Sequence, residues 1–279
     1  MGFNLKIPRV KILAALLLFP LSAAFCAEEN IPDLAHPYSS LPAVDAGTAP
    51  VRGDWKGERL EYEIYWGIMK VGSAYLHIDK IVSVDGRPAY HIISGARSAA
   101  FIQNFYTVKD INESWLDIAG MYSHGYYKNI REGGYRFNEW VAFDPAAKSF
   151  RGEKMNKKRS VSPVEGSLPG PVNDVLSALY MARTMDLSPG SSLSVTVNTK
   201  RTWDMNIKVR KREKESTEYG KFKCVVVEPQ LGDDGLFVAK EGKKMLVWLT
   251  DDALRLPLVL KAEIFIGSVT AKLVKRGIE

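Results

Sequence analysis

The chain has very few cysteines, because only Cys26 and Cys224 occur among its 279 residues. Cys26 lies at the end of an apolar N-terminal segment that we expect to be removed, which would leave Cys224 alone. A single cysteine cannot form an intrachain disulfide. The fold must therefore be held by the burial of apolar surface, and a chain of this length can bury roughly three quarters of the surface that it exposes when unfolded.

The sequence also lacks an apolar run long enough to span a bilayer comfortably. The run Ile12–Phe19 is shorter than the roughly 20 residues that a membrane-spanning helix needs. It follows the basic residues Lys6, Arg9 and Lys11 and precedes small residues, which is the pattern of a secretory signal peptide. We therefore predict that residues 1–26 are a signal peptide and that the protein is exported to the periplasm.

Lipid attachment at Cys26 is an alternative that we do not favour. A lipoprotein signal has a small residue just before its cysteine, whereas bulky Phe25 precedes Cys26 in this chain. We expect the mature protein to be soluble, and peripheral to a membrane at most.

A strong net charge is missing as well. The formal charge of the whole chain is +6, and it falls to +3 when the signal peptide, with three basic and no acidic residues, is removed. So small a charge on so long a chain does not provide the basic surface of a nucleic-acid-binding protein. We therefore expect no nucleic acid partner.

Motifs of known catalytic or metal-binding chemistry are absent too. The histidines His36, His77, His91 and His124 are not at metal-ligand spacing from one another. There is no G-x-S-x-G sequence, no phosphate-binding loop and no Cys-x-x-Cys pair. We therefore assign no catalytic residue, no metal ligand and no cofactor, and we favour a non-enzymatic role. A Ser-His-Asp site assembled from distant positions stays open.

The sequence does contain a repeated alternation of apolar and polar residues. In the first instance Leu60, Tyr62, Ile64 and Trp66 alternate with more polar residues, which is typical of a half-buried β-strand. The pattern recurs through most of the following residues and predicts about ten to twelve strands.

Short turns join these strands. Asp85-Gly86 and Gly133-Gly134 are typical of tight β-hairpins, and sequential hairpins favour an antiparallel meander. A sheet of so many strands must curl or close. We therefore predict a mainly β fold for residues 55–279, a single domain. It would be a strongly curved antiparallel sheet, or an incompletely closed β-barrel, with one packed helix.

Residues 27–54 show no periodicity and contain four prolines. Such a segment cannot bury enough apolar surface to order itself. We predict a flexible linker, which would serve as a spacer or would simply be a frayed terminus.

One helix interrupts the strands. Asn173 or Asp174 can cap a helix over Val175–Leu187, and Ser188-Pro189-Gly190 would end it. Arg183 lies near the middle of the apolar stripe of this helix.

A buried, unpaired charge costs roughly 3–5 kcal/mol, so Arg183 should find a carboxylate. Asp186, three residues on, and Asp117 are our candidates for a structural ion pair. Glu61, Asp110 and Glu113 are further options. Alternatively, Arg183 faces a cavity and grips an anionic head group.

Several segments occur in an order and spacing that can be compared with known families. They are Gly57-Glu58-Arg59-Leu60-Glu61-Tyr62, Gly67 with Val71-Gly72, Asp85-Gly86-Arg87-Pro88-Ala89-Tyr90, Phe105-Tyr106-Thr107-Val108-Lys109-Asp110, Glu113-Ser114 with Asp117, and Asn173-Asp174-Val175-Leu176-Ser177-Ala178-Leu179-Tyr180 with Arg183. Over roughly residues 55–275 the chain resembles the bacterial exported family called domain of unknown function 3108.

The resemblance implies an exported, β-rich domain of a Gram-negative-type envelope, and it supplies no catalytic residues. The expected architecture is also similar to that of periplasmic lipoprotein carriers, in which a curved sheet wraps a helix over an apolar cavity. That second step is an analogy of fold.

We therefore expect the protein to bind or carry an apolar or amphipathic, lipid-like molecule between sheet and helix. The candidate ligand-binding residues are Arg183, Trp66, Tyr106 and Trp115, with Arg183 or exposed lysines orienting a polar end. Two alternatives stay open, a scaffold or adaptor that binds an envelope protein partner and a hydrolase of glycans or lipids. A third, an outer-membrane barrel, is disfavoured by the internal helix and by the charged residues Lys272, Lys275, Arg276 and Glu279.

Basic residues gather twice, at Lys154–Arg159 and at Lys208–Lys214. Charged strand edges discourage aggregation, and this is the ordinary interpretation. Contact with anionic lipid head groups is the alternative.

Overall fold

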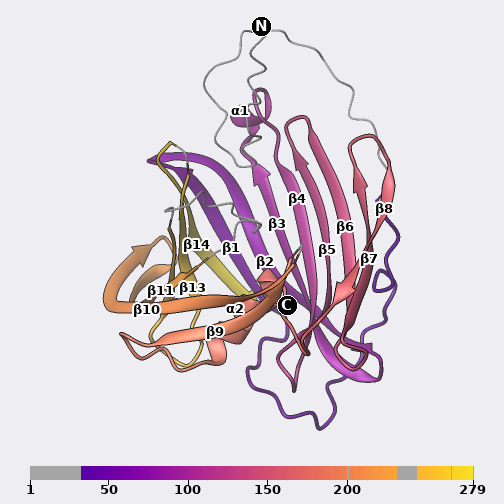
Figure 1. Ribbon diagram of the computed structural model, residues 1–279. Helices are drawn as coiled ribbons and strands as arrows, with labels where there is room; N and C mark the ends of the chain where they lie inside the picture. Colours follow the sequence, from indigo (N-terminus) through magenta and orange to yellow (C-terminus); the bar gives the residue numbers. More distant parts are fainter. Residues whose placement is uncertain (1–32, 200, 231–243, 265, 279) are drawn as a thin grey trace, which may run out of the picture.

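The computed structural model describes residues 33–199, 201–230, 244–264 and 266–278. Over these ranges the chain forms one sheet of fourteen strands and the helices α1 (Ala100–Gln103) and α2 (Val175–Thr184) (Figure 1). The strands are β1 (Glu58–Trp66), β2 (Met69–Val84), β3 (Arg87–Ser98), β4 (Lys109–Asp117), β5 (Ser123–Glu132), β6 (Tyr135–Asp144), β7 (Ser149–Asn156), β8 (Val161–Ser167), β9 (Ser192–Asn198), β10 (Thr202–Thr217), β11 (Gly220–Pro229), β12 (Met245–Thr250), β13 (Pro257–Glu263) and β14 (Ser268–Ile278). Neither described helix has the length and apolar character needed to cross a membrane.

The sheet is an antiparallel meander in which each strand pairs with the next along the chain. The exception is that β1 pairs with β14, so β8 and β9 are the two edges. Strands β3 to β8 form a wide, gently curved run, while β1, β2 and β9 to β14 curl round beside it (Figure 1). The predicted mainly β fold, a strongly curved antiparallel sheet or incompletely closed β-barrel with one packed helix, is confirmed, and the sheet curls without closing. It has fourteen strands rather than about ten to twelve.

The tight turn between β2 and β3 shows how the sequence sets the meander. Asp85 and Gly86 both have positive φ angles, 49° and 77°. This is the left-handed backbone that a two-residue hairpin requires, and Asp-Gly adopts it at low cost.

The edge strand β9 approaches β5 through the loop before α2, not through strand pairing. The carbonyl of Val172 accepts a hydrogen bond from the N–H of Ser123 in β5 at 2.9 Å. Asn173 donates to Thr196 at 2.9 Å and accepts from Asn198 at 2.8 Å, both in β9. These two loop residues therefore fill the space between the curled part of the sheet and β5.

Helix α2 begins at a capping box. The carboxylate of Asp174 accepts hydrogen bonds from two N–H groups of the first turn, and Ser177 accepts one from the N–H of Asp174. The helix ends at Thr184, before the predicted Leu187, because Met185 adopts an extended conformation.

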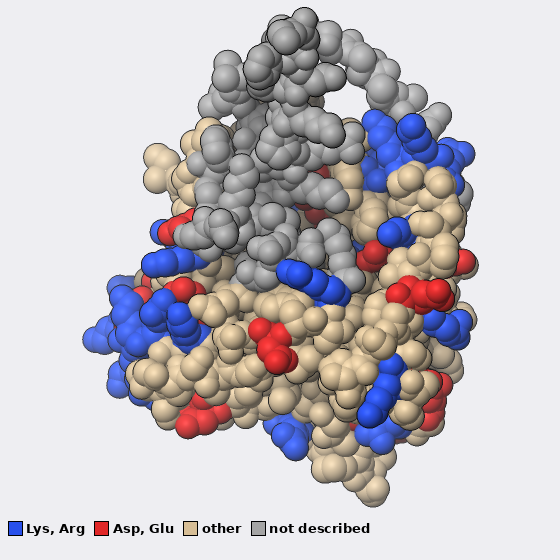
Figure 2. Space-filling model, viewed as in Figure 1, with Lys and Arg blue, Asp and Glu red and all other residues tan. Residues whose placement is uncertain are grey.

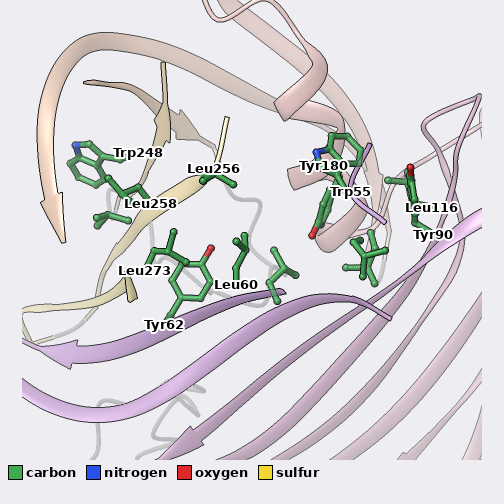
Figure 3. Packing of buried hydrophobic residues seen from close by; sticks show 14 of the residues in the cluster. Trp55, Leu60, Tyr62, Tyr90, Leu116, Tyr180, Trp248, Leu256, Leu258 and Leu273 are labelled. Atoms are coloured by element: carbon green, nitrogen blue, oxygen red, sulfur yellow. The ribbon is translucent and has the colours of Figure 1, made fainter. Parts of the chain in front are cut away.

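The core lies between α2 and the sheet (Figure 3). Tyr180 of α2 and Trp55, which precedes β1, lie edge to face with ring centroids 4.9 Å apart. Leu60 and Tyr62 of β1 and Leu273 of β14 complete this part of the cluster and are buried. The other side of α2 carries alanines that pack against β9, β10, β11 and β12.

The described part of the predicted linker, residues 33–54, packs against the sheet instead of standing free. We call it the N-terminal strap. The ring of Tyr38 stacks on Trp115 at 4.3 Å between centroids, and its hydroxyl donates to the carbonyl of His124 at 2.7 Å. The N–H of Val44 donates to β2. The strap shows no period-two pattern because only the part around Tyr38 lies on the sheet face opposite α2. Farther along, Ala43 makes a single antiparallel bridge with Val82 of β2, and Val44 and Ala46 pack against the core on the α2 side.

Candidate ligand-binding site

Strand β1 presents an acidic residue to the interior of the molecule. Glu58 has the same parity as Leu60 and Tyr62, so it points toward α2. Arg183 of α2 meets it there in a bidentate ion pair, with Nη1 to Oε1 at 2.6 Å and Nη2 to Oε2 at 3.0 Å. Both side chains are buried, with 0% and 1% of the arginine and glutamate exposed. The pair joins α2 to the sheet.

Aromatic rings and hydrogen-bond acceptors enclose the guanidinium of Arg183. Its carbon lies 5.0 Å from the ring centroid of Trp55 and 4.9 Å from that of Tyr180, and Nε and Nη2 also donate to the carbonyl of Leu254. Burial by itself would lower the pKa of Arg183, but the hydrogen bonds and charge of Glu58 raise it above its ordinary value. Arg183 thus has a structural partner in place of a ligand head group.

The carboxylates predicted as partners of Arg183 lie elsewhere. Asp186 accepts hydrogen bonds from Ser188. Asp117 binds Arg87 at 2.6 Å and lies 3.2 Å from Nε2 of His124. The prediction of an Arg183 pair with Asp186 or Asp117 is therefore wrong.

The environment of Asp117 is itself unusual. Burial would raise the pKa of this carboxyl, but hydrogen bonds from His124, Arg87 and the N–H of Gly120 together hold the pKa well below its usual range. Asp117 therefore stays ionised in the folded protein.

The candidate aromatic residues do not gather around Arg183. Trp115 lies on the opposite sheet face, stacked on His91 at 5.1 Å and covered by the strap. Trp66 is at the end of β1 and donates to the carbonyl of Ile266 at 3.0 Å. Tyr106 lies between α1 and β4, where burial raises its pKa to about 12. The predicted set of Arg183, Trp66, Tyr106 and Trp115 does not form one site.

The space between α2 and the sheet, where we expected a ligand, is filled by the core. Near the C-terminal end of α2, a recess of about 450 Å³ is lined by charged residues, among them Arg52, Asp251 and Arg255. A charged, open recess does not suit an acyl chain.

Farther along β1 the described residues cover the same inner face less completely. After Tyr62 the next inward position is Ile64, which lies opposite Gly72 of β2 and Ala271 of β14. Ala271 in turn lies opposite Leu260 of β13. Ile64, Ala271 and Leu260 are only half-buried.

Ala74 and Ala96 form the neighbouring pair of β2 and β3 and are half-buried as well. We call these six residues, Ile64, Gly72, Ala74, Ala96, Leu260 and Ala271, the upper inner face. It is uncharged and made mostly of small side chains, so it can accept an apolar group against the sheet.

A polar pocket borders this face where β4 and β5 meet the start of α2. Ser94 has the parity of Ala96 and lies opposite Asn112, which lies opposite Lys128. The pocket is lined by Asn112, Lys128, Asn198 and Thr199, among others, and has a free volume of about 10 Å³, enough for roughly one water.

Oxygens in this pocket lack partners among the described residues. Oδ1 of Asn112, Oδ1 of Asn198 and Oγ1 of Thr199 are buried and make no hydrogen bond within that part of the chain. Buried polar atoms normally have one, so the pocket suits a water or a donor group of a ligand. Nζ of Lys128 lies 3.7 Å from Oε1 of Glu139 and 4.1 Å from the ring centroid of Tyr126.

Metal chemistry gains no support from the part of the chain that the structure describes. No three of its histidine, cysteine, aspartate and glutamate side chains come together in a way that could hold a metal ion.

A family model described as "Protein of unknown function (DUF3108)" matches residues 61–274. The chain belongs to the DUF3108 family. No curated protein matches it. Among solved structures, it is similar in fold to a β-barrel-like protein of domain of unknown function DUF1849 from Brucella abortus. That likeness has a TM-score of 0.51 at 10% identity, and it covers 80% of this chain and 97% of that chain.

Weaker likenesses accompany it. A candidate exported protein with a YmcC-like fold from Bacteroides fragilis is 8% identical, with a TM-score of 0.36, 80% of this chain covered and 96% of that chain. A candidate lipoprotein from Parabacteroides distasonis is 11% identical, with a TM-score of 0.30 and coverages of 80% and 95%. These likenesses concern the fold alone.

Sequence reasoning missed Glu58 and Trp55 in this DUF3108 chain. A signal for Glu58 was present, since it has the inward parity of Leu60 and Tyr62 on the first strand. An acidic residue at an inward position requires a cation, and Arg183 was the one cation that the helix pattern had placed inside.

Proposed function

We propose that this DUF3108 protein binds or carries an apolar or amphipathic molecule of the cell envelope on its upper inner face. The observation that carries the proposal is the change along β1, where the packed core at Leu60 and Tyr62 gives way to the half-buried Ile64. An acyl chain laid on this surface would gain about 0.8 kcal/mol for each methylene removed from water.

The polar end of such a ligand belongs at the polar pocket. Lys128 supplies a positive charge, and the unpartnered oxygens of Asn112, Asn198 and Thr199 supply acceptors for a hydroxyl or amine. This assignment replaces Arg183, whose guanidinium is committed to Glu58.

The proposed compartment is the periplasm. Support comes from the signal-peptide pattern of residues 1–26. These residues, Cys26 among them, and residues 27–32 of the predicted linker lie outside the residues that the structure describes.

A matched pair of variants on β14 tests the proposal. Ala271→Phe adds a ring to the upper inner face, whereas Thr270→Phe adds the same ring on the opposite face, since neighbouring strand residues alternate. With dansyl-labelled undecanoic acid as the probe, we expect Ala271→Phe to weaken binding at least about ten-fold, because it occupies the space of the acyl chain. Thr270→Phe should bind as the wild type does.

The proposal is contradicted if the wild type does not bind the probe, or if both variants bind alike. Unfolding curves of the two variants, recorded alongside, show whether either change has damaged the fold. A stoichiometric protein partner with no bound lipid in material from the native envelope would instead favour the scaffold.

A further inference from the structure

The connections at one end of the sheet form a continuous row. The N–H of Gly67 donates to Ser268 at 3.3 Å, which joins the β1–β2 and β13–β14 connections. The N–H of Gly133 donates to Thr107 at 2.7 Å, which joins the β5–β6 turn to the β3–β4 connection. Strand pairing of β6 with β7 places the β7–β8 turn next.

We call this row the docking rim. It comprises residues 66–70, 99–107, 133–134, 157–160 and 266–268.

Large apolar side chains of the docking rim point into solvent. Ile68 is 100% exposed, Phe105 75%, Ile266 57%, Phe101 53% and Met69 43%. They come from three neighbouring connections, so they form one group rather than scattered residues. An exposed apolar group of this kind marks a surface that another phase or molecule covers.

The charge of the docking rim has one sign. It contains the basic residues Lys70, Lys157, Lys158 and Arg159 and no aspartate or glutamate. Lys70 contacts Glu63 of β1, whereas the side chains of the β7–β8 turn are exposed. Figure 2 shows Lys and Arg side chains gathered at the upper right, where Figure 1 places this turn.

Exposed aliphatic and aromatic residues next to basic ones are the combination that binds an anionic bilayer surface. The apolar side chains enter the boundary between head groups and acyl chains, and the lysines meet the lipid phosphates. We propose that the docking rim binds the anionic surface of a lipid bilayer.

The docking rim also adjoins the upper inner face. Ile64 and Trp66 are successive inward positions of β1, and Ile68 follows directly in the β1–β2 connection. Under the proposed function, on which this inference rests, a bilayer bound at the docking rim would lie at the open end of the ligand face. A lipid could then pass between bilayer and protein without crossing water.

Vesicle flotation of the mature, exported protein tests the inference. The vesicles contain phosphatidylethanolamine with anionic phosphatidylglycerol, or phosphatidylcholine alone as the neutral control. We expect the wild type to bind the anionic vesicles, and added salt to weaken that binding. Ile68→Ser combined with Phe105→Ser should lower the partition coefficient at least about ten-fold.

Two further variants sharpen the test. Lys157→Glu combined with Lys158→Glu should abolish the preference for anionic vesicles, because it reverses the charge of the β7–β8 turn. Leu254→Ser is the matched control, since Leu254 is also exposed, at 42%, but lies in the β12–β13 connection at the other end of the sheet. It should leave vesicle binding unchanged.

The inference is overturned if the wild-type protein binds neither kind of vesicle, or if the docking-rim variants bind vesicles as the wild type does. Titration with dansyl-labelled undecanoic acid in solution separates the two proposals. A docking-rim variant that loses vesicle binding but still binds the probe supports the inference about the docking rim. A wild-type protein that binds vesicles but not the probe contradicts only the proposed function.

Discussion

At the scale of single residues, the Arg183–Glu58 pair shows what a buried charge requires. Both side chains are removed from water, and each has the other as its charged partner within 2.6 Å. Such a pair adds little net stability compared with an apolar replacement, but leaving one member alone is costly.

We therefore expect Arg183→Met to lower the free energy of unfolding by about 3–5 kcal/mol, because the buried Glu58 loses its bidentate partner and keeps only Arg276, whose Nε lies 3.8 Å away, as a charged neighbour. Arg183→Met combined with Glu58→Leu should recover most of that loss. Urea unfolding at neutral pH measures both. Equal stability of the single and double variants would show that the two residues are not coupled.

Asp117 gives a pH dependence whose sign follows from its surroundings. Its pKa is lower in the folded protein than in the unfolded chain. The stability from this group is therefore fully present above the unfolded pKa, about 3.9, and is lost as the pH falls toward the folded pKa.

We expect Asp117→Asn to be less stable than the wild type at pH 7 by about 1–3 kcal/mol, since hydrogen bonds to a charged acceptor are lost. The difference should shrink when chemical unfolding is repeated at pH values below about 4. A difference that stays constant with pH would assign the effect to packing.

At this scale the sequence could single out Arg183 but not its partner. The helical period put the arginine on an apolar face, while the choice among carboxylates depended on which strand lies beneath α2. Glu58 is 125 residues away along the chain, so local pattern carried no information about that contact.

At the scale of elements, period-two alternation identified the strands that have one face in the core. The alternation does not mark β8, the edge strand Val161–Ser167, which is largely exposed and contains Pro163. Proline is tolerated at an edge because no ladder hydrogen bond is lost there. An exposed edge strand has no buried face, and therefore no alternation to detect.

The start of α2 was predictable to within two residues, Asn173 or Asp174, and the structure assigns the cap to Asp174. Asp174→Ala should lower the melting temperature through the loss of about 0.5–2 kcal/mol, and somewhat more because Ser114 also donates to this carboxylate. Asn173→Ala is the control and should cost less, since the Oδ1 atom of Asn173 has no hydrogen-bond partner in the described parts of the chain. The reverse order in calorimetry would contradict the assignment.

The N-terminal strap was predicted as a linker because its composition resembles that of disordered segments. The ring of Tyr38 nevertheless stacks on Trp115 on the outer face of the sheet. This contact leaves no periodic pattern in the sequence. The composition correctly indicated that this segment forms no helix or strand, but it did not indicate that the N-terminal strap packs against the sheet.

Tyr38→Ala should therefore destabilise the protein by about 2–4 kcal/mol, as for other buried aromatic truncations. Ser39→Ala, at an exposed neighbour, should change the stability by less than about 0.5 kcal/mol. Denaturant unfolding distinguishes the two. Equal, small effects would mean that residues 33–54 act as a linker after all.

At the scale of the whole molecule, short turns made the meander predictable because each hairpin fixes its own neighbours. The pairing of β1 with β14 and the backbone hydrogen bonds of Val172 and Asn173 join distant parts of the chain. These contacts decide how far the sheet curls. The predicted interior for a ligand was therefore misplaced, since the curl brings α2 onto the sheet and fills that space.

The curled sheet divides the interior into a packed lower part and an uncharged upper face that opens toward the docking rim. The proposed function requires that upper inner face to be a binding surface. Residues such as Ala74 and Ala271 are uninformative in sequence, because small residues in strands have many explanations. Their common face became visible only through the register.

Mass spectrometry of the protein purified gently from its native envelope tests this claim most directly. We predict that an acyl-bearing molecule accompanies the wild type and the Thr270→Phe variant in near-equal amount to the protein and is missing from Ala271→Phe. A wild-type protein free of any such molecule, or one that carries it equally with Ala271→Phe, would contradict the account.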